Sequence, residues 1–240
     1  MRNQDGFTLV EMSIVLVIIG LIVGGILAGQ EIVNDGRIKI QVAQIDALKS
    51  ATASFHDQFV FYPGDYKADG MLAPDNSIDG NEDGIVDNGG GLGLADTAIN
   101  GKEMDFALQQ MQLANLITGV SNPGAGHYVY QGKLNGSAVY YGDFIWPAGS
   151  SAVKSIRLQA LSSTDVAPTP AVRTSDAISI DGKYDDGLPL SGSIFASQAS
   201  SGTNCCSGAQ CSDAAISTTA TYGTSGPQNA TNCVLIWQIQ

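Results

Sequence analysis

Residues 7–27 read FTLVEMSIVLVIIGLIVGGIL, and this stretch decides how the chain is organised. Its 21 residues include a single charged side chain, Glu11. As a helix the stretch would be about 31 Å long, which matches the roughly 30 Å hydrocarbon core of a bilayer. The sequence therefore predicts one membrane-spanning helix near the N-terminus.

Glu11 is an unusual residue for a membrane span. A charge within a bilayer costs at least about 2.5 kcal/mol, and the span contains no Lys or Arg to pair with it. A cut between Gly6 and Phe7 would create an α-ammonium four residues before Glu11, on the same helix face. Glu11 could then pair with this amine or with that of a neighbouring chain. A secretory signal removed after Ala28 is a poorer alternative, because an acid is out of place in such a signal.

The segment Gly6-Phe7-Thr8-Leu9-Val10-Glu11, followed by an uncharged run, resembles the class III signal of type IV prepilins and type II secretion pseudopilins. The resemblance implies that a membrane prepilin peptidase cuts after Gly6 and N-methylates Phe7, and that assembly requires Glu11. It also implies that these helices pack side by side in the core of a filament.

A second apolar pattern follows the span. Side chains recur at spacings of 3 or 4 residues, at Ile38, Val42, Ile45, Leu48, Thr52, Phe55 and Phe59. This period is typical of a helix with one buried face. The sequence predicts one helix from Phe7 to about Val60, roughly 80 Å long, and Tyr62-Pro63-Gly64-Asp65 ends it. Two helices hinged at Gly29 or Gly36 are the alternative.

The chain thus divides into a leader (1–6), a membrane and assembly half-helix (7–29), an amphipathic half-helix (30–60) and an exported domain (61–240). We expect an α+β, pilin-like fold, in which the amphipathic half-helix packs on a small antiparallel sheet. The pattern predicts a helix at 102–117, a hairpin of strands 128–134 and 138–146, and further strands at 153–158, 193–196 and 233–239. Thr174 or Ser175 is expected to cap a short helix that ends at Ile180.

Two further segments extend the resemblance beyond the leader. Tyr62-Pro63-Gly64-Asp65 is similar to a PGD element of some prepilin-like proteins. Residues 181–192, DGKYDDGLPLSG, are similar to their D-x-K-x-D-D-G-x-P-x-x-G segment.

Residues 79–87 read DGNEDGIVD and fit the pattern D-x-N-x-D-G-x-x-D. Ca²⁺ takes about six to eight hard oxygen ligands, which alternate residues can aim inward while a Gly permits the turn. The expected ligands are Asp79, Asn81, Asp83, the carbonyl of Ile85, and Asp87. Because Gly90 occupies the position of the usual final Glu, we expect a short Ca²⁺ loop and not an EF-hand. A solvated acidic turn is the alternative, and Asp181, Asp185 and Asp186 form a second acidic cluster.

The cysteines are all near the C-terminus, at Cys205, Cys206, Cys211 and Cys233. An even number in an exported domain predicts disulfides. A bond between the adjacent Cys205 and Cys206 is disfavoured, so two connectivities remain open, each with one bridge to Cys233. His56 and His127 are expected to be structural.

The composition narrows the functional classes. The chain of 240 residues has 11 basic and 23 acidic side chains and a net charge of −12, which excludes the basic footprint of a duplex-binding protein. It contains no common hydrolase, nucleotide-binding or metalloprotease motif, so we expect no enzyme and no nucleic-acid partner.

The resemblance implies a structural subunit of a type IV pilus or type II secretion pseudopilus. It would lie in the bacterial inner membrane with a periplasmic C-terminal domain before entering a filament. Its expected partners are prepilin peptidase and other pilin or pseudopilin subunits. The alternative is a single-pass, membrane-tethered, calcium-dependent binding module that never polymerises.

Overall fold

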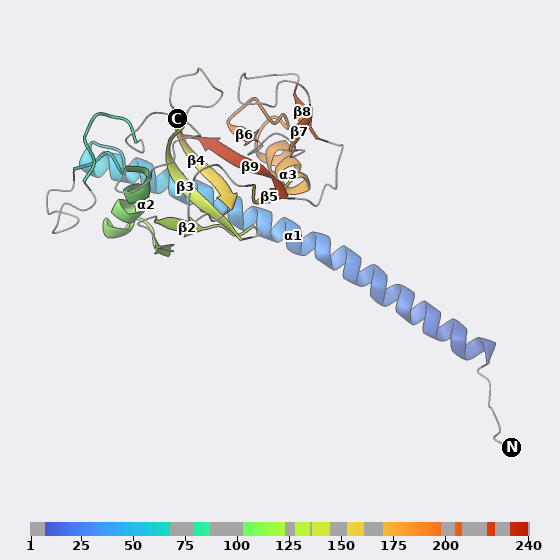
Figure 1. The fold of residues 1–240 in the computed structure, drawn as a ribbon. Coiled ribbons are helices and arrows are strands. Elements are labelled where there is room, and N and C mark those ends of the chain that lie inside the picture. Colours follow the sequence, from blue (N-terminus) through green and yellow to red (C-terminus); the bar gives the residue numbers. More distant parts are fainter. Residues whose placement is uncertain are drawn as a thin grey trace.

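One helix, α1 (Leu9–Phe59), forms the long axis of the molecule in the computed structural model (Figure 1). The structure describes residues 8–67, 79–86, 103–122, 128–134, 136–144, 153–160, 170–197, 205–207, 220–223 and 231–239. Helix α1 begins after Thr8 and ends at Val60, whose left-handed backbone has a φ of 68°. The prediction of a continuous helix is confirmed, since α1 passes through Gly29 and Gly36 without a break.

The two halves of α1 have different surroundings. Apolar side chains of the N-terminal half are exposed, and this half extends away from the rest of the molecule (Figure 1). The C-terminal half buries one face, which consists of Ile38, Gln41, Val42, Gln44, Ile45, Leu48, Ala51, Thr52 and Phe55. The predicted stripe is confirmed from Ile38 to Phe55, and Phe59 is half-buried.

Two glutamines on this face bind the backbone of the domain. Gln41 Oε1 accepts a hydrogen bond of 2.6 Å from the Lys133 N–H, and Gln44 Nε2 donates one of 2.9 Å to the Gln131 carbonyl. Both glutamine side chains are buried, so these bonds satisfy amide groups that would otherwise lie inside the protein without partners. The helix is therefore attached by polar as well as apolar contacts.

The main sheet packs against the C-terminal half of α1, and its strand pairs are antiparallel. Among the described residues its order is β1-β2-β3-β4-β9-β5, with β6 also paired to β9. The strands are β1 (Val120–Ser121), β2 (Val129–Gln131), β3 (Ser137–Phe144), β4 (Val153–Ala160), β5 (Val172–Arg173), β6 (Ile194–Ser197) and β9 (Thr231–Gln238). Strands β7 (Cys206–Ser207) and β8 (Thr221–Tyr222) form a separate pair, and the other helices are α2 (Glu103–Leu113) and α3 (Thr174–Tyr184).

The core lies between α1, α2 and the sheet. Its fully buried side chains include Ile45, Leu48, Phe55, Leu108, Met111, Val139, Ile156, Leu158 and Leu235. A second cluster places Val234 and Ile236 of β9 against Leu190, Phe195 and Ala220. Strand β9 is therefore buried on both faces, and the expected α+β, pilin-like arrangement of a long helix on an antiparallel sheet is confirmed.

The predicted hairpin is confirmed, but its first strand is shorter than the sequence indicates. Strand β2 ends at Gln131, and Leu134 is buried in the core instead of continuing the strand. A side chain at Gly132 would overlap Ser137, so the backbone approaches closely there. The Ser137 N–H, at the start of β3, donates to the Leu134 carbonyl at 2.8 Å.

The two shorter helices also differ from their predicted bounds. Helix α2 ends at Leu113 and not at residue 117, because Asn115 takes a left-handed φ of 59°. Helix α3 continues to Tyr184, and Arg173 occupies its N-cap position without a side-chain hydrogen bond. Thr174 is the first helical residue and is buried, so the predicted cap by Thr174 or Ser175 was wrong.

Candidate functional site

Thr8 and Glu11 cap the N-terminus of α1. The Glu11 carboxylate accepts hydrogen bonds of 2.8 Å from the Thr8 N–H and 2.7 Å from the Thr8 hydroxyl, which in turn accepts from the Glu11 N–H at 3.3 Å. This reciprocal capping box satisfies backbone donors that a helix start leaves open. It also places the carboxylate beside the residue that follows Phe7 in the chain. Gly6 and Phe7 themselves lie outside the described residues.

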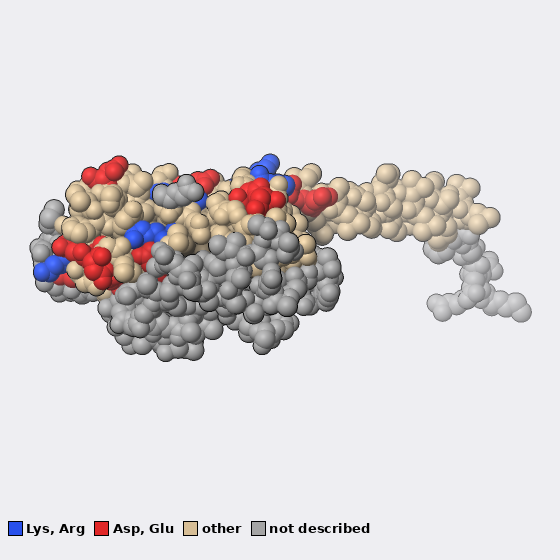
Figure 2. All heavy atoms as spheres, turned by 90° about the horizontal axis from the view of Figure 1, so that it is seen from above, with Lys and Arg blue, Asp and Glu red and all other residues tan. Residues whose placement is uncertain are grey.

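The N-terminal half of α1 presents an apolar surface on every side. Figure 2 shows it as a rod without basic or acidic side chains over most of its described length, in contrast to the domain. Its mean hydropathy reaches 2.7 over 18 residues, none of which is buried, so it is long and apolar enough to cross a membrane. Within the described part of the chain, a Cβ atom at Gly20, Gly24 or Gly25 would meet nothing within 4 Å. Packing within the chain therefore does not require these glycines.

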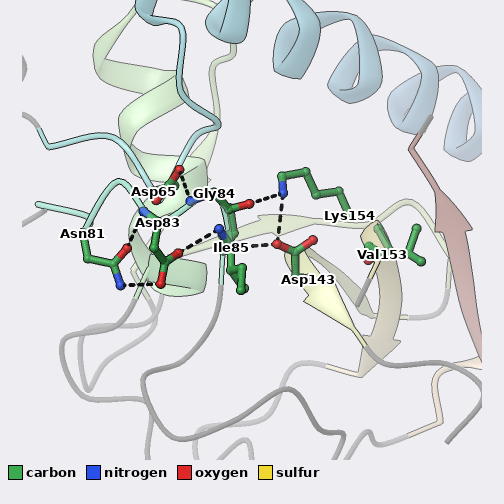
Figure 3. A network of polar contacts seen from close by, with 10 residues as sticks. Asp65, Asn81, Asp83, Gly84, Ile85, Asp143, Val153 and Lys154 are labelled. Atoms are coloured by element: carbon green, nitrogen blue, oxygen red, sulfur yellow. Dashed lines mark hydrogen bonds and ion pairs between the residues drawn. The ribbon is translucent and has the colours of Figure 1, made fainter. Parts of the chain in front are cut away.

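The predicted calcium loop forms two local turns in the structure (Figure 3). The Asn81 side-chain oxygen accepts from the Asp83 N–H at 2.9 Å, and Asp83 Oδ1 accepts from the Ile85 N–H at 2.8 Å. The Asn81 amide also donates to Asp83 Oδ2 at 3.0 Å. Asp87 lies outside the described residues. The side chains of Asn81 and Asp83 thus bond to the loop itself.

Asp83 has acidic neighbours that the loop motif does not include. A carboxylate oxygen from each of Asp65, Asp83 and Glu103 lies within 4.8 Å of the others. Asp65 follows α1 and Glu103 begins α2, so three separate segments meet here. Of the other predicted ligands, Asp79 does not belong to this group. The acidic group could bind a metal ion, and sequence spacing gave no signal for Asp65 or Glu103.

Glycines allow these segments to approach closely. A Cβ at Gly64, where φ is +98°, would lie 2.5 Å from the Glu103 carbonyl oxygen, and one at Gly80 would overlap the Asp65 backbone. The fully buried Gln110 of α2 accepts from the Gly64 N–H at 2.7 Å and donates to the Tyr66 carbonyl at 2.8 Å. These contacts give a physical reason for the Pro-Gly-Asp sequence after α1.

A partly buried ion pair attaches the loop to the sheet (Figure 3). The Val86 N–H donates to Asp143 of β3 at 2.7 Å, and the Lys154 ammonium of β4 lies 3.1 Å from the same carboxylate oxygen. Lys154 also donates to the Gly84 carbonyl at 2.7 Å. The loop is thereby held between the sheet and α2.

The second acidic cluster, Asp181, Asp185 and Asp186, also brings carboxylate oxygens within 4.8 Å of one another. Each carboxylate is bonded to nearby groups. Asp185 accepts from the N–H groups of Ser193 and Ile194, Asp186 from the Leu188 N–H, and Asp181 from the Tyr222 hydroxyl at 2.7 Å. These hydrogen bonds therefore connect the end of α3 to β6 and β8.

Asp181 makes the stability of the fold depend on pH. Its side chain is fully buried, and burial raises its pKa to about 6 against the opposing hydrogen bonds from Tyr222 and Gly187. An unfolded Asp has a pKa near about 3.9. The folded chain therefore binds the proton more tightly, and its stability falls as the pH rises from about 4 to about 6.

As the pH rises from about 4 to about 7, the free energy of unfolding of the wild type should fall by roughly 2 kcal/mol more than that of an Asp181→Asn variant. The variant has no carboxyl group at this position to lose a proton. Urea unfolding of both full-length proteins in detergent, with a chelator present, measures the difference. Parallel stability curves for the two proteins would contradict the assignment.

The described cysteines are oxidised. Cys205 forms a disulfide with Cys233 of β9, and Cys206 is also disulfide-bonded. The bridge from Cys205 is one of the two connectivities left open by the sequence, whereas Cys211 lies outside the described residues. His56 is half-buried with its ring centroid 4.5 Å from that of Tyr62, and His127 is outside the described residues.

Comparison with known proteins identifies only the N-terminus. Residues 1–27 match the family model described as the prokaryotic N-terminal methylation motif, which is the signature of type IV prepilins. No curated protein and no solved structure matches the chain. The motif points to a structural subunit of the pilin type rather than an enzyme, and with the apolar half of α1 it fits a protein anchored in the inner membrane.

Proposed function

We propose that the chain is the precursor of a structural subunit of a type IV pilus or type II secretion pseudopilus. Prepilin peptidase cleaves it after Gly6 and N-methylates Phe7, and the mature subunit enters a helical filament. The observation that carries this proposal is the exposed apolar half of α1, most of which lies within the methylation motif. A surface of this kind is stable in a membrane or against copies of itself, but not in water.

The arrangement of α1 suits both environments. Before assembly the half-helix spans the inner membrane, and the domain lies in the periplasm, where the Cys205–Cys233 disulfide can persist. After assembly the same surface packs against neighbouring helices. Gly20, Gly24 and Gly25 have open space around them, which permits close helix approach.

The charge of Glu11 favours the transfer of the subunit from the membrane to the filament. Cleavage leaves an α-ammonium at Phe7, one residue before the Thr8 N–H that Glu11 contacts. In the filament this ammonium and the Glu11 carboxylate of an adjacent chain neutralise each other in apolar surroundings. Contacts between unlike patches that do not close into a ring then extend the helical polymer.

Recovery of sheared surface filaments or of an overproduced pseudopilus tests this function. We expect the chain in the filament fraction, and we expect it to stay in the membrane fraction of cells that lack prepilin peptidase. If the chain stays wholly in the membrane while the same cells yield filaments of other subunits, the proposal is wrong. The non-polymerising binding module would then account for the protein.

A further inference from the structure

The group of Asp65, Asp83 and Glu103 contains a buried carboxylate oxygen that has no hydrogen-bond partner in the described part of the chain. Asp65 is 1% exposed, and its Oδ2 accepts from the Gly84 N–H at 3.2 Å, whereas its Oδ1 has no hydrogen-bond partner among the described residues. Figure 3 shows this side chain pointing toward the turn formed by Asp83 and Gly84. Buried polar atoms are normally satisfied, and a buried negative charge needs a positive partner.

The other two carboxylates retain the capacity to bind a cation. Asp83 is exposed, and each of its oxygens accepts one hydrogen bond within the loop, which leaves further lone pairs. Glu103 is 7% exposed, and its Oε1 accepts from the Asn81 N–H at 2.8 Å. Three acids this close together repel one another unless a cation lies among them.

The Lys154 ammonium, whose charge acts on Asp65, is committed to other contacts. The Lys154 ammonium donates to the Gly84 carbonyl and is paired with Asp143. The acidic group therefore keeps an excess of negative charge that Lys154 does not neutralise.

We infer that Asp65, Asp83 and Glu103 form a Ca²⁺ site. Ca²⁺ prefers hard oxygen ligands and accepts irregular coordination completed by water, which suits carboxylates from three separate segments. The exposed Asp83 leaves a route for the ion and its waters. This site replaces the contiguous ligand set that the loop motif predicts, because it includes Asp65 and Glu103 and excludes Asp79.

Bound Ca²⁺ would join three parts of the domain at one point. Asp65 follows the end of α1, Asp83 lies in the loop that Lys154 ties to the sheet, and Glu103 starts α2. The ion would therefore stabilise the domain and hold the loop in place. This inference does not depend on polymerisation, since the contacts lie within one chain.

Titration of the full-length protein in detergent micelles with CaCl₂, followed by calorimetry, tests the site. We expect saturable binding by the wild type at or below millimolar Ca²⁺, as in extracellular calcium modules. Asp65→Asn and Asp83→Asn should each weaken binding at least about tenfold, because each removes a charged ligand. Asp83 is exposed, so its variant tests the site even if Asp65→Asn impairs folding.

Asp79→Asn is the matched control, because it changes the same type of residue in the same loop outside the acidic group. We expect its affinity to stay within about twofold of the wild type. A wild type that binds no Ca²⁺ at about 5 mM would overturn the inference. It would also be overturned if Asp79→Asn weakened binding as much as Asp83→Asn, or if neither Asp65→Asn nor Asp83→Asn changed it.

Discussion

Replacing Glu11 by alanine should leave the protein inserted in the membrane and almost abolish its recovery in filaments. Insertion does not suffer, because the variant no longer places a carboxylate in the apolar span. Assembly suffers because the Phe7 ammonium of the neighbouring subunit loses its partner. A charge uncompensated in such surroundings costs at least about 2.5 kcal/mol, which corresponds to roughly 60-fold in an equilibrium.

Glu11→Gln separates the charge of this residue from its capping role. Glutamine can replace glutamate in a capping box, so this variant should preserve the start of α1 while it removes the charge. We expect it to assemble as poorly as Glu11→Ala. Glu31→Ala, on the same helix beyond the apolar run, is the control and should assemble normally. Immunoblots of membrane and filament fractions compare the three variants. A normal filament yield from Glu11→Gln would show that Glu11 only caps the helix and that its charge is not needed for assembly.

Replacing Gly64 by alanine should destabilise the domain by about 4 kcal/mol. A left-handed backbone costs a side-chain-bearing residue roughly 1–3 kcal/mol, and overpacking costs a further 1–3 kcal/mol or so. Both penalties apply, since φ is +98° and the new Cβ would lie 2.5 Å from the Glu103 carbonyl oxygen and 2.8 Å from Val86 Cγ1. Urea unfolding of the full-length protein measures the loss.

Gly84→Ala is the matched control for this effect. Gly84 has a similar φ of +87°, but a Cβ there would meet no described atom within 4 Å. Only the backbone penalty applies, so we expect a loss of about 1–2 kcal/mol. Equal losses for the two variants would show that the close approach of Gly64 to α2 is unimportant.

The long helix was predictable because its signals are local. An uninterrupted apolar run specifies the exposed half, and the 3- and 4-residue spacing from Ile38 to Phe55 specifies the buried face. Gln41 and Gln44 escaped the prediction, since a pattern of apolar residues cannot reveal polar side chains that are buried to satisfy a distant backbone.

The acidic site was only partly predictable. The loop motif identifies Asp83, and the Pro-Gly-Asp element draws attention to Asp65, but no short spacing connects the two residues or links them to Glu103. Tertiary contacts bring them together, chiefly the close packing at Gly64 and the hydrogen bonds of Gln110. The pairing of Cys205 with Cys233 was likewise one of two open choices until the fold placed both residues.

The mature N-terminus provides the most direct test of the central claim, which is that a peptidase liberates an ammonium group to pair with Glu11. Mass spectrometry of the N-terminal peptide, from protein purified out of the native membrane, reads the cleavage and the methylation together. We predict a chain that begins with N-methylated Phe7. A chain that still carries Met1 or residues 2–6 would contradict the account of assembly.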